Sequence, residues 1–427
     1  MRELSGQSEL ASTPKAHPFR WSRKGALRKA VPFMGPAFLV SVGYIDPGNW
    51  ATNIEGGATF GYTLLWVLLL SNLMAILLQI LAAKLGVATG KSLAENCREH
   101  FRKPVAFFLW ITAELAAMAT DLAEFLGAAL GIYILFGIPM FPAALIGGAI
   151  TFGILLLHRY GYRVVEIVIF SFVAIVALVY VFEIFLAKPD WLQIGYSVFV
   201  PRLDSSSLFV AIGMLGATVM PHNIYLHSAI VQHRLRPGDP EHNHRVYKYS
   251  IVDSTAALNI AWFINSSMII MAASVFFANG YGVESIEEAY ATLTPLLGGF
   301  ASLAFAIALL SSGLSSSVTG TMAGQYILEG FLKVRIALWI RRLVTMVPAL
   351  IIIGMGIDAL KALIISQVVL SMQLPFTIIP LILFTKNKKL MGRYANKPIT
   401  NVLVVTVAVI IISLNVLLLY QAFGGEF

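Results

Sequence analysis

The sequence predicts an all-α membrane protein with many spans, on the strength of its composition, its hydropathy and the lengths of its apolar runs. Of the 427 residues, 58% are hydrophobic and only 12% are charged, whereas a soluble globular chain carries about 25% charged residues. The mean hydropathy is +0.79. Apolar runs such as 64–81 and 402–419 approach the ~20 residues that a helix needs to cross the ~30 Å hydrocarbon core of a bilayer. We therefore expect the chain to lie in a lipid bilayer.

Eleven apolar stretches, separated by clusters of charged and turn-forming residues, are expected to form the membrane-spanning helices. They lie near residues 31–57, 62–87, 104–133, 140–158, 163–187, 208–233, 246–277, 299–330, 336–354, 358–384 and 398–423. A polar, basic tail precedes them at residues 1–30, and no connection is long enough for a separate soluble domain. The segment 285–293 has the composition of a short helix lying over the outer face.

The positions of the basic residues predict the orientation. Of the 30 Lys and Arg residues, all but Lys188, Arg202 and Lys361 fall in the tail or in alternate connections. The positive-inside rule then places the N-terminus in the cytoplasm and the C-terminus outside the cell membrane. The formal charge of +8 thus reflects topology, and no nucleic-acid partner is expected. The single cysteine, Cys97, excludes an internal disulfide and a cysteine-cluster metal site.

Two of the expected spans carry a proline-centred break at mid-span. Asp46-Pro-Gly-Asn49 interrupts the first span, and Met220-Pro-His-Asn223 interrupts the sixth. Proline removes a backbone donor and disfavours a continuous helix. Unpaired backbone at membrane depth persists only where protein or a hydrated cavity satisfies it. One such break alone is commonly an ordinary kink, but two matched breaks with polar residues indicate a binding site.

The spacing of the two breaks predicts an internal duplication. Five spans begin with each broken helix, so residues 31–187 and 208–384 are expected to be two five-helix repeats, followed by the eleventh helix at 398–423. Because five is odd, the second repeat must be inverted relative to the first. Inverted repeats whose first helices are interrupted at the midplane are typical of transporters with a site at that point.

The residues at the breaks predict a site for a metal ion. Asp46 is an acid in mid-span, which is costly and therefore typically functional. Asn49 offers an amide oxygen, Met220 a thioether, and unwinding frees carbonyl groups, with those of Ala217 and Gly43 the best placed. Oxygen ligands alone suit magnesium or calcium, while sulfur shifts the preference toward transition metals. A lone methionine would instead be interpreted as a packing residue.

These motifs resemble the paired signatures of the Nramp family of proton-coupled divalent metal transporters. The similarity covers nearly the whole chain and includes three flanking segments, Ala51-Thr-Asn-Ile-Glu-Gly-Gly57, Ala119-Thr-Asp-Leu-Ala-Glu-Phe-Leu-Gly127 and Tyr225-Leu-His-Ser228. The resemblance implies a leucine-transporter-like fold and import of manganese or ferrous iron by alternating access. It further implies that Asp46, Asn49, Met220 and the Ala217 carbonyl bind the ion, and that Gln367 joins them when the site is occluded.

A face of the third span carries three acids. At 100° per residue, Glu114, Asp121 and Glu124 lie on one side of the helix 104–133. Acids grouped in this way at membrane depth indicate a hydrated path or a proton path. His222 adds a group that titrates near neutrality.

The resemblance implies that Asp46 and Asp121 handle the proton, supported by Glu124 and His222. Arg341 and Arg342 resemble basic residues that continue this path. Their position at the inner end of a span is equally typical of positive-inside anchoring.

The other charged and polar residues of the spans suggest structural roles. Glu166, Glu183 and Asp253 are interpreted as salt-bridged structural acids near helix ends, and the small residues of 311–324 predict close helix packing. An amino-acid or sugar carrier and a passive channel are alternative functions. An enzyme is disfavoured because no nucleophile–base set is recognisable. Neither a cofactor nor an obligate protein partner is expected; the partners are divalent metal ions, protons and lipid.

Overall fold

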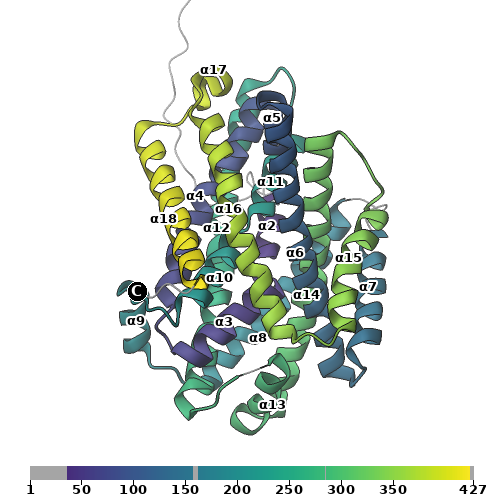
Figure 1. Ribbon diagram of the computed structural model, residues 1–427, viewed down its shortest axis with the longest axis vertical. Coiled ribbons are helices and arrows are strands. Elements are labelled where there is room, and N and C mark those ends of the chain that lie inside the picture. Colours follow the sequence, from purple (N-terminus) through teal and green to yellow (C-terminus); the bar gives the residue numbers. More distant parts are fainter. Residues whose placement is uncertain (1–35, 157–161, 284, 424–427) are drawn as a thin grey trace, which may run out of the picture.

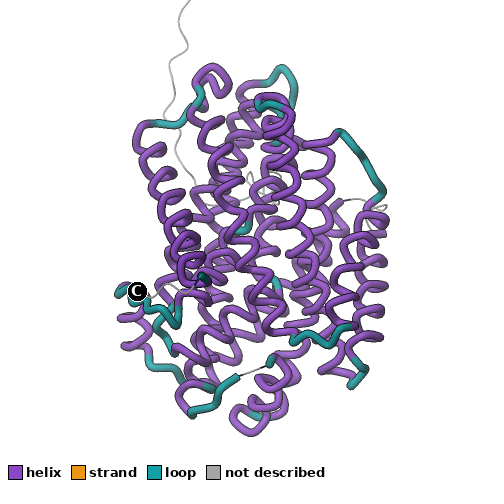
Figure 2. Tube along the Cα trace, in the orientation of Figure 1, coloured by secondary structure: helices purple, strands orange, loops and turns teal. Residues whose placement is uncertain are grey.

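The computed structural model describes residues 36–156, 162–283 and 285–423, and these segments are helices joined by short loops (Figure 1 and Figure 2). The predicted tail at 1–30 lies outside the described residues. No strand occurs in the described segments. The prediction of an all-α fold is confirmed.

The expected spans are all found, with ends that shift by only a few residues for most of them. The first five are the broken helix α2 (Pro36–Ser41), η1 (Val42–Ile45) and α3 (Pro47–Phe60), then α4 (Leu65–Thr89), α6 (Lys103–Phe136), α7 (Met140–Leu156) and α8 (Tyr162–Ala187). The next five are the broken helix α10 (Leu208–Val219) and α11 (Pro221–Ile230), then α12 (Pro240–Val275), α14 (Gly299–Leu332), α15 (Leu338–Gly354) and α16 (Ala359–Lys386). The eleventh is α18 (Pro398–Ala422).

Short helices occupy the connections. They are α5 (Leu93–His100), α9 (Trp191–Phe199), η3 (Val231–Arg234), η4 (Phe277–Asn279), α13 (Ile286–Leu297), α17 (Lys388–Met391) and η5 (Gly392–Tyr394). Helix α13 is the short helix predicted from the sequence, and Ser285 caps it by accepting a hydrogen bond from the backbone N–H of Glu288 at 3.0 Å.

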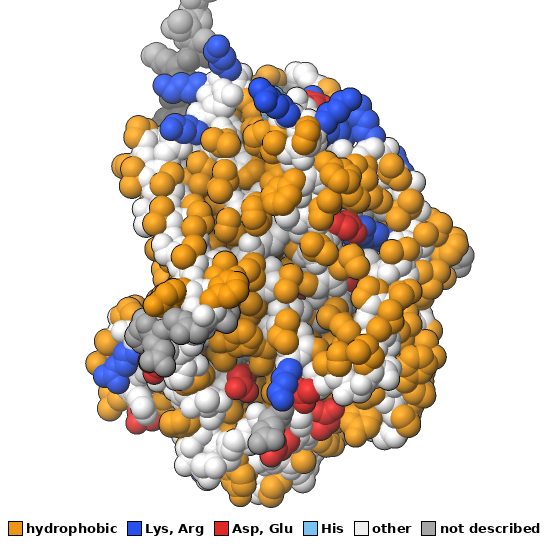
Figure 3. All heavy atoms as spheres, viewed as in Figure 1, with side chains coloured by type: hydrophobic (Ala, Val, Ile, Leu, Met, Phe, Trp, Pro, Cys, Tyr) orange, Lys and Arg blue, Asp and Glu red, His pale blue; other side chains and the backbone are white. Residues whose placement is uncertain are grey.

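The two ends of the molecule differ in charge. On the face shown in Figure 3, Lys and Arg side chains gather at the end that carries α5 and α17, and a group of Asp and Glu side chains lies near α13 at the opposite end. Apolar side chains cover the surface between them. Within the described residues, eight helices are long and apolar enough to cross a membrane.

Helices α6 and α14 pack closely at the centre, as the small residues of 311–324 predicted. A Cβ atom added to Gly313 would lie 2.5 Å from the backbone nitrogen of Ala128, and one added to Gly131 would lie 2.7 Å from Cβ of Leu310. Such distances are too short for any side chain, so the backbones approach each other only because these positions are glycine.

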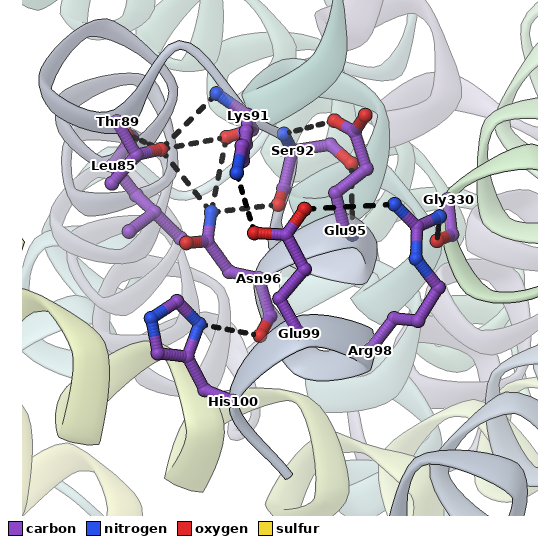
Figure 4. A network of polar contacts seen from close by, with 10 residues as sticks. All are labelled: Leu85, Thr89, Lys91, Ser92, Glu95, Asn96, Arg98, Glu99, His100 and Gly330. Carbon is purple, nitrogen blue, oxygen red and sulfur yellow. Dashed lines mark hydrogen bonds and ion pairs between the residues drawn. The ribbon is translucent and has the colours of Figure 1, made fainter. Parts of the chain in front are cut away.

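Helix α5 lies at the basic end of the bundle and is fixed there by polar contacts (Figure 4). Ser92 and Glu95 form a capping box, in which the Ser92 Oγ accepts from the Glu95 N–H at 3.2 Å and the Glu95 carboxylate accepts from the Ser92 N–H at 2.7 Å. This reciprocal pair fixes the start of a helix of only eight residues.

The same helix is tied to its surroundings by charged side chains. Arg98 donates to the carbonyl of Gly330 at the end of α14, and Lys91 contacts Glu99 at 2.5 Å. The hydrogen bond from Lys91 holds the pKa of the Glu99 carboxyl below its ordinary value. Cys97, on the same helix, is fully buried.

Candidate metal-binding site

The first break places an acid at the beginning of a helix. Asp46 has an extended backbone (φ −68°, ψ 164°) and separates η1 from α3, with Pro47 in the first turn of α3. One carboxylate oxygen of Asp46, Oδ1, accepts from the backbone N–H of Asn49 at 2.9 Å. The carboxylate is therefore the N-cap of α3, where the helix dipole also favours negative charge.

The second break frees the carbonyl groups at the end of a helix. Helix α10 ends at Val219, and Met220 (φ 14°, ψ 104°) has a non-helical backbone that separates α10 from α11, which begins at Pro221. Since the last carbonyls of a helix have no partner within it, they are available to other groups. The carbonyl of Ala217 accepts from the Asn49 side chain at 3.1 Å.

Asn49 joins the two breaks. Its Nδ2 donates to Asp46 Oδ1 at 2.7 Å and to the Ala217 carbonyl at 3.1 Å. Consequently its own Oδ1 faces away from these partners, and it has no hydrogen bond. Asn49 thus links Asp46 of the first break to the end of α10, three residues before Met220.

Gln367 on α16 completes the group. A Cβ atom added to Gly48 would overlap the Gln367 amide, so this side chain lies against the first turn of α3. The Gln367 Nε2 donates to the Ser366 hydroxyl at 3.0 Å, which leaves Oε1 without a partner.

The site therefore holds three buried oxygen atoms without hydrogen bonds: Asp46 Oδ2, Asn49 Oδ1 and Gln367 Oε1. The side chains that carry them are 0% exposed, as is Met220. An unpaired acceptor inside a protein is costly, and several such acceptors beside a thioether sulfur fit a cation with mixed oxygen and sulfur ligands. No cluster of three His, Cys, Asp or Glu residues suited to a metal occurs elsewhere in the described segments.

Two neighbouring residues, Gly43 and Asn223, bear on which groups could bind the ion. The Gly43 carbonyl, a predicted ligand, already accepts from the backbone N–H of Asp46 at 3.3 Å. Asn223, which the sequence prediction did not include, lies 3.4 Å from the Met220 sulfur through Nδ2, and its buried Oδ1 has no partner. A Cβ atom on Gly43 would lie 2.5 Å from the Asn223 amide nitrogen. Glycine at position 43 therefore makes room for Asn223 beside the sulfur.

The acids of α6 meet the arginines of α15. Glu114 contacts Arg341 at 2.5 Å, and Asp121 contacts Arg342 at 3.1 Å. Arg342 is 0% exposed and also donates to the Ser317 hydroxyl on α14 at 3.0 Å. Both arginines thus have specific partners inside the bundle, which anchoring at the membrane surface would not require.

Glu124 lies on α6 between Asp121, which contacts Arg342, and Gly127, which packs against Pro47 of the first break. It is 0% exposed, and both carboxylate oxygens lack hydrogen-bond partners. Gly320 on α14 gives it room, because a Cβ atom there would meet the Glu124 carboxylate.

The predicted support from His222 has a structural basis. Its Nδ1 lies 3.0 Å from the hydroxyl of Thr120 on α6, so the second break contacts the acid-bearing helix directly. The first break also contacts α6, because a Cβ on Gly127 would overlap the Pro47 ring. Neither Thr120 nor Ser317 was predicted. The only sequence signals for them are that Thr120 precedes Asp121 on α6 and that Ser317 lies in the small-residue run of α14.

Two cavities face the site from opposite ends of the molecule. One, of about 570 Å³, lies at the basic end among α5, α11 and α14 and is lined by residues such as Gln232 and Met322. The other, of about 870 Å³, lies among α3, α13 and α16 and includes Glu55 and Ile364. The ligands are shielded from both.

Comparisons with known proteins identify the family of the chain. A profile of the family described as natural resistance-associated macrophage protein-like, Nramp, matches residues 37–421. The divalent metal cation transporter MntH of Caldanaerobacter subterraneus subsp. tengcongensis is 54% identical over 401 residues, which cover 94% of this chain and 95% of that protein. The transporter of the same name from Bacillus subtilis is 45% identical and covers 97% of this chain and 98% of its own.

Solved structures show the same architecture. The manganese transporter of Eremococcus coleocola, in complex with an aromatic bis-isothiourea substituted compound, has a TM-score of 0.84 and 35% identity, covering 95% of this chain and 88% of that one. Mhp1, a nucleobase-cation-symport-1 family transporter, has a TM-score of 0.58 at 14% identity, covering 83% and 78%. The second likeness concerns the fold alone.

Proposed function

Because this chain belongs to the Nramp family, we propose that it imports manganese and ferrous iron across the cell membrane together with protons. It is a transporter of divalent metal ions and not an enzyme. The observation that carries the proposal is the group of unpaired buried oxygens at the two helix breaks, where Asn49 links Asp46 to the Ala217 carbonyl and the Met220 sulfur is buried.

The chemistry of this group supports a transition metal as substrate. One carboxylate, two amide oxygens, a carbonyl and a thioether would bind an ion that has lost part of its hydration shell. Hard ions gain nothing from the sulfur, whereas manganese, iron and softer ions do. With only one formal charge among the ligands, binding would remain weak enough for release.

The contacts around Glu124 support a path for protons. We place the path from Asp46 through Glu124 to Asp121 and on to Glu114, with His222 at its side. Arg341 and Arg342 each place a positive charge next to one of the last two acids, Glu114 and Asp121.

The cavities at both ends support alternating access. A buried site with a cavity on either side needs only a modest displacement of the broken helices to open toward one of them. Helix α2 is held to α12 through the Ala37 N–H, which donates to the Asp253 carboxylate at 3.0 Å. This contact supports a closed basic end, and its release would free α2.

The repeats and the orientation complete the proposal. Residues 31–187 and 208–384 would be the two inverted halves, each beginning with a broken helix, with 398–423 outside them. The basic end shown in Figure 3 would face the cytoplasm, with the N-terminus on that side and the C-terminus outside.

The test is uptake of a panel of divalent ions into proteoliposomes with the internal pH recorded. We expect manganese and iron to enter and to acidify the lumen, while calcium and magnesium do not enter. Metal entry without acidification would favour a passive channel. Entry of an amino acid or sugar in place of metal would contradict the proposal.

A further inference from the structure

A second buried acid lies outside the proposed metal site and the proposed proton path. Glu183 on α8 is 0% exposed, and neither of its carboxylate oxygens has a hydrogen-bond partner. Among the described residues it takes part in no ion pair, so its interpretation as a salt-bridged structural acid is wrong. The side chain of Glu166, interpreted in the same way, lies outside the described residues, and the Asp253 carboxylate accepts a hydrogen bond from the Ala37 backbone N–H.

Two buried hydrogen-bond donors, one on α8 and one on α3, are also unpaired. Tyr180 lies one turn before Glu183 on the same face of α8, and its buried hydroxyl has no partner. The Tyr180 ring packs edge-on against the Trp50 indole with centroids 5.0 Å apart, and the buried indole N–H is likewise unpaired. The Phe305 ring of α14 also packs against the Trp50 ring, with centroids 5.2 Å apart.

This group joins α8 to the helix that carries the metal ligands. Trp50 follows Asn49 directly in the first turn of α3, so its indole moves whenever that turn moves. Glu183 lies one turn before the end of α8 at Ala187, and helices α12, α13 and α14 pack against α8.

No basic side chain of the described residues contacts Glu183; the nearest one along the chain is Lys188, just beyond the end of α8. On its own helix the adjacent titratable group is Tyr180, on α13 the titratable groups are Glu287, Glu288 and Tyr290, and on η1 there is Tyr44. In α12 the charged residues end with Asp253, and in α14 the only one is Glu329 at the basic end. A carboxylate in an apolar environment with neither partner nor counterion is strongly disfavoured, so Glu183 carries a proton in this conformation.

We propose that Glu183 is a second proton-binding site. It keeps its proton while α3 has the position seen in this structure, and it releases the proton when Trp50 or Tyr180 moves onto its carboxylate. The Tyr180 hydroxyl and the Trp50 indole N–H are two buried donors without partners that could serve an ionised Glu183. A displacement of α3 that brings the Trp50 indole N–H onto the carboxylate, or that lets the Tyr180 side chain turn toward it, would stabilise the ionised form, and the proton would pass to water admitted by the same displacement. The inference rests on the proposed transport function, because it links this proton to the movement of the metal-binding helix.

Infrared difference spectroscopy of the protein in lipid vesicles, with and without manganese, tests the inference directly. We expect manganese to reduce the carbonyl absorption of protonated carboxylic acids. Part of that change should disappear in Glu183→Gln, which keeps the shape of the side chain but cannot ionise. Glu99→Gln, at a partly exposed acid on α5, is the matched control and should leave the change intact. Identical spectra for the parent and Glu183→Gln would overturn the proposal.

A second measurement keeps the inference testable if Glu183→Gln fails to fold. Tyr180→Phe retains the ring and removes one donor, so the ionised form of Glu183 loses a partner. We expect its pH profile of manganese uptake to shift by about one pH unit toward alkaline values, which corresponds to one hydrogen bond to a charged group. An unshifted profile contradicts the role of Tyr180 and, with unchanged spectra, the proposal.

The outcomes separate this inference from the proposed function. If the parent protein takes up manganese without moving protons, the proposed function fails. If protons move but Glu183→Gln behaves like the parent in the infrared experiment, only the role of Glu183 fails.

Discussion

Two polar regions lie side by side inside this bundle, and they handle charge in opposite ways. At the helix breaks Asp46 is the only acid, and four buried oxygens, on Asp46, Asn49, Asn223 and Gln367, have no hydrogen-bond partner. Between α6 and α15, Glu114 and Asp121 each contact an arginine, at 2.5 and 3.1 Å. The first region holds no positive charge within the described residues, while in the second each of these two acids lies beside an arginine. The difference teaches that an acid without a basic neighbour is suited to bind an external cation, whereas an acid beside an arginine already has a counterion.

The largest effect should come from removing the only charge at the breaks. We expect Asp46→Ala to lower manganese uptake by at least about a hundredfold, which corresponds to roughly 3 kcal/mol of lost binding. Asp46 also caps α3, so Asp46→Asn, which can still accept a hydrogen bond, serves as the control for folding. Uptake close to that of the parent in either variant would remove Asp46 from the site.

The next effect concerns selectivity. Met220→Ala removes the only sulfur and leaves a group of oxygens that hard ions can use. We expect calcium to compete with manganese uptake in this variant and cadmium to lose affinity, each by about ten- to thirtyfold, or 1–2 kcal/mol. Competition assays on parent and variant measure both. If calcium is still excluded, Met220 is a packing residue.

The region between α6 and α15 should respond differently to the loss of an acid. In Asp121→Asn we expect proton flux during manganese uptake to fall by about tenfold while manganese binding changes by less than about threefold. The variant leaves Arg342 buried without its counterion, which costs about 3–5 kcal/mol of stability. A lower thermal midpoint is therefore expected as well.

A double variant separates stability from proton transport in that region. Asp121→Asn with Arg342→Gln leaves no unpaired charge, so its thermal midpoint should return toward that of the parent while proton flux stays low. Recovery of proton flux in the double variant would show that Asp121 only balances Arg342.

The smallest effect tests the position of Gln367. A methyl group at residue 48 would overlap the Gln367 amide, so Gly48→Ala should displace it and weaken manganese binding by about fivefold, or 1 kcal/mol. Gly153→Ala is the matched control, because its added Cβ meets no atom within 4 Å. Equal affinities of the two variants would show that Gln367 does not bind the ion.

Much of this architecture was predictable because its signals are local. Apolar runs gave the spans, and Pro47 and Pro221 marked the breaks, since proline disrupts a helix wherever it stands. The contact between Asn223 and Met220 was not predictable, because it depends on the absence of a side chain at Gly43 in another helix.

Charge pairing was equally hard to predict from the sequence. Arg341 and Arg342 fit positive-inside anchoring as well as a polar path, and only the approach of α15 to α6 distinguishes the two. Glu183 was expected to have a charged partner because burial of an unpaired acid is rare. The structure shows the rarer case, and no pattern along α8 signals it.

The burial of Cys97 has a practical consequence for following the transport cycle. It is the chain's only thiol, and its side chain is buried where α5 packs against the bundle. A cysteine introduced at Ile364 or at Met322, which line the two opposite cavities, would thus be the sole reactive sulfur in an otherwise native chain. Its rate of alkylation by a water-soluble maleimide, with and without manganese, would report directly which side of the protein is open to water.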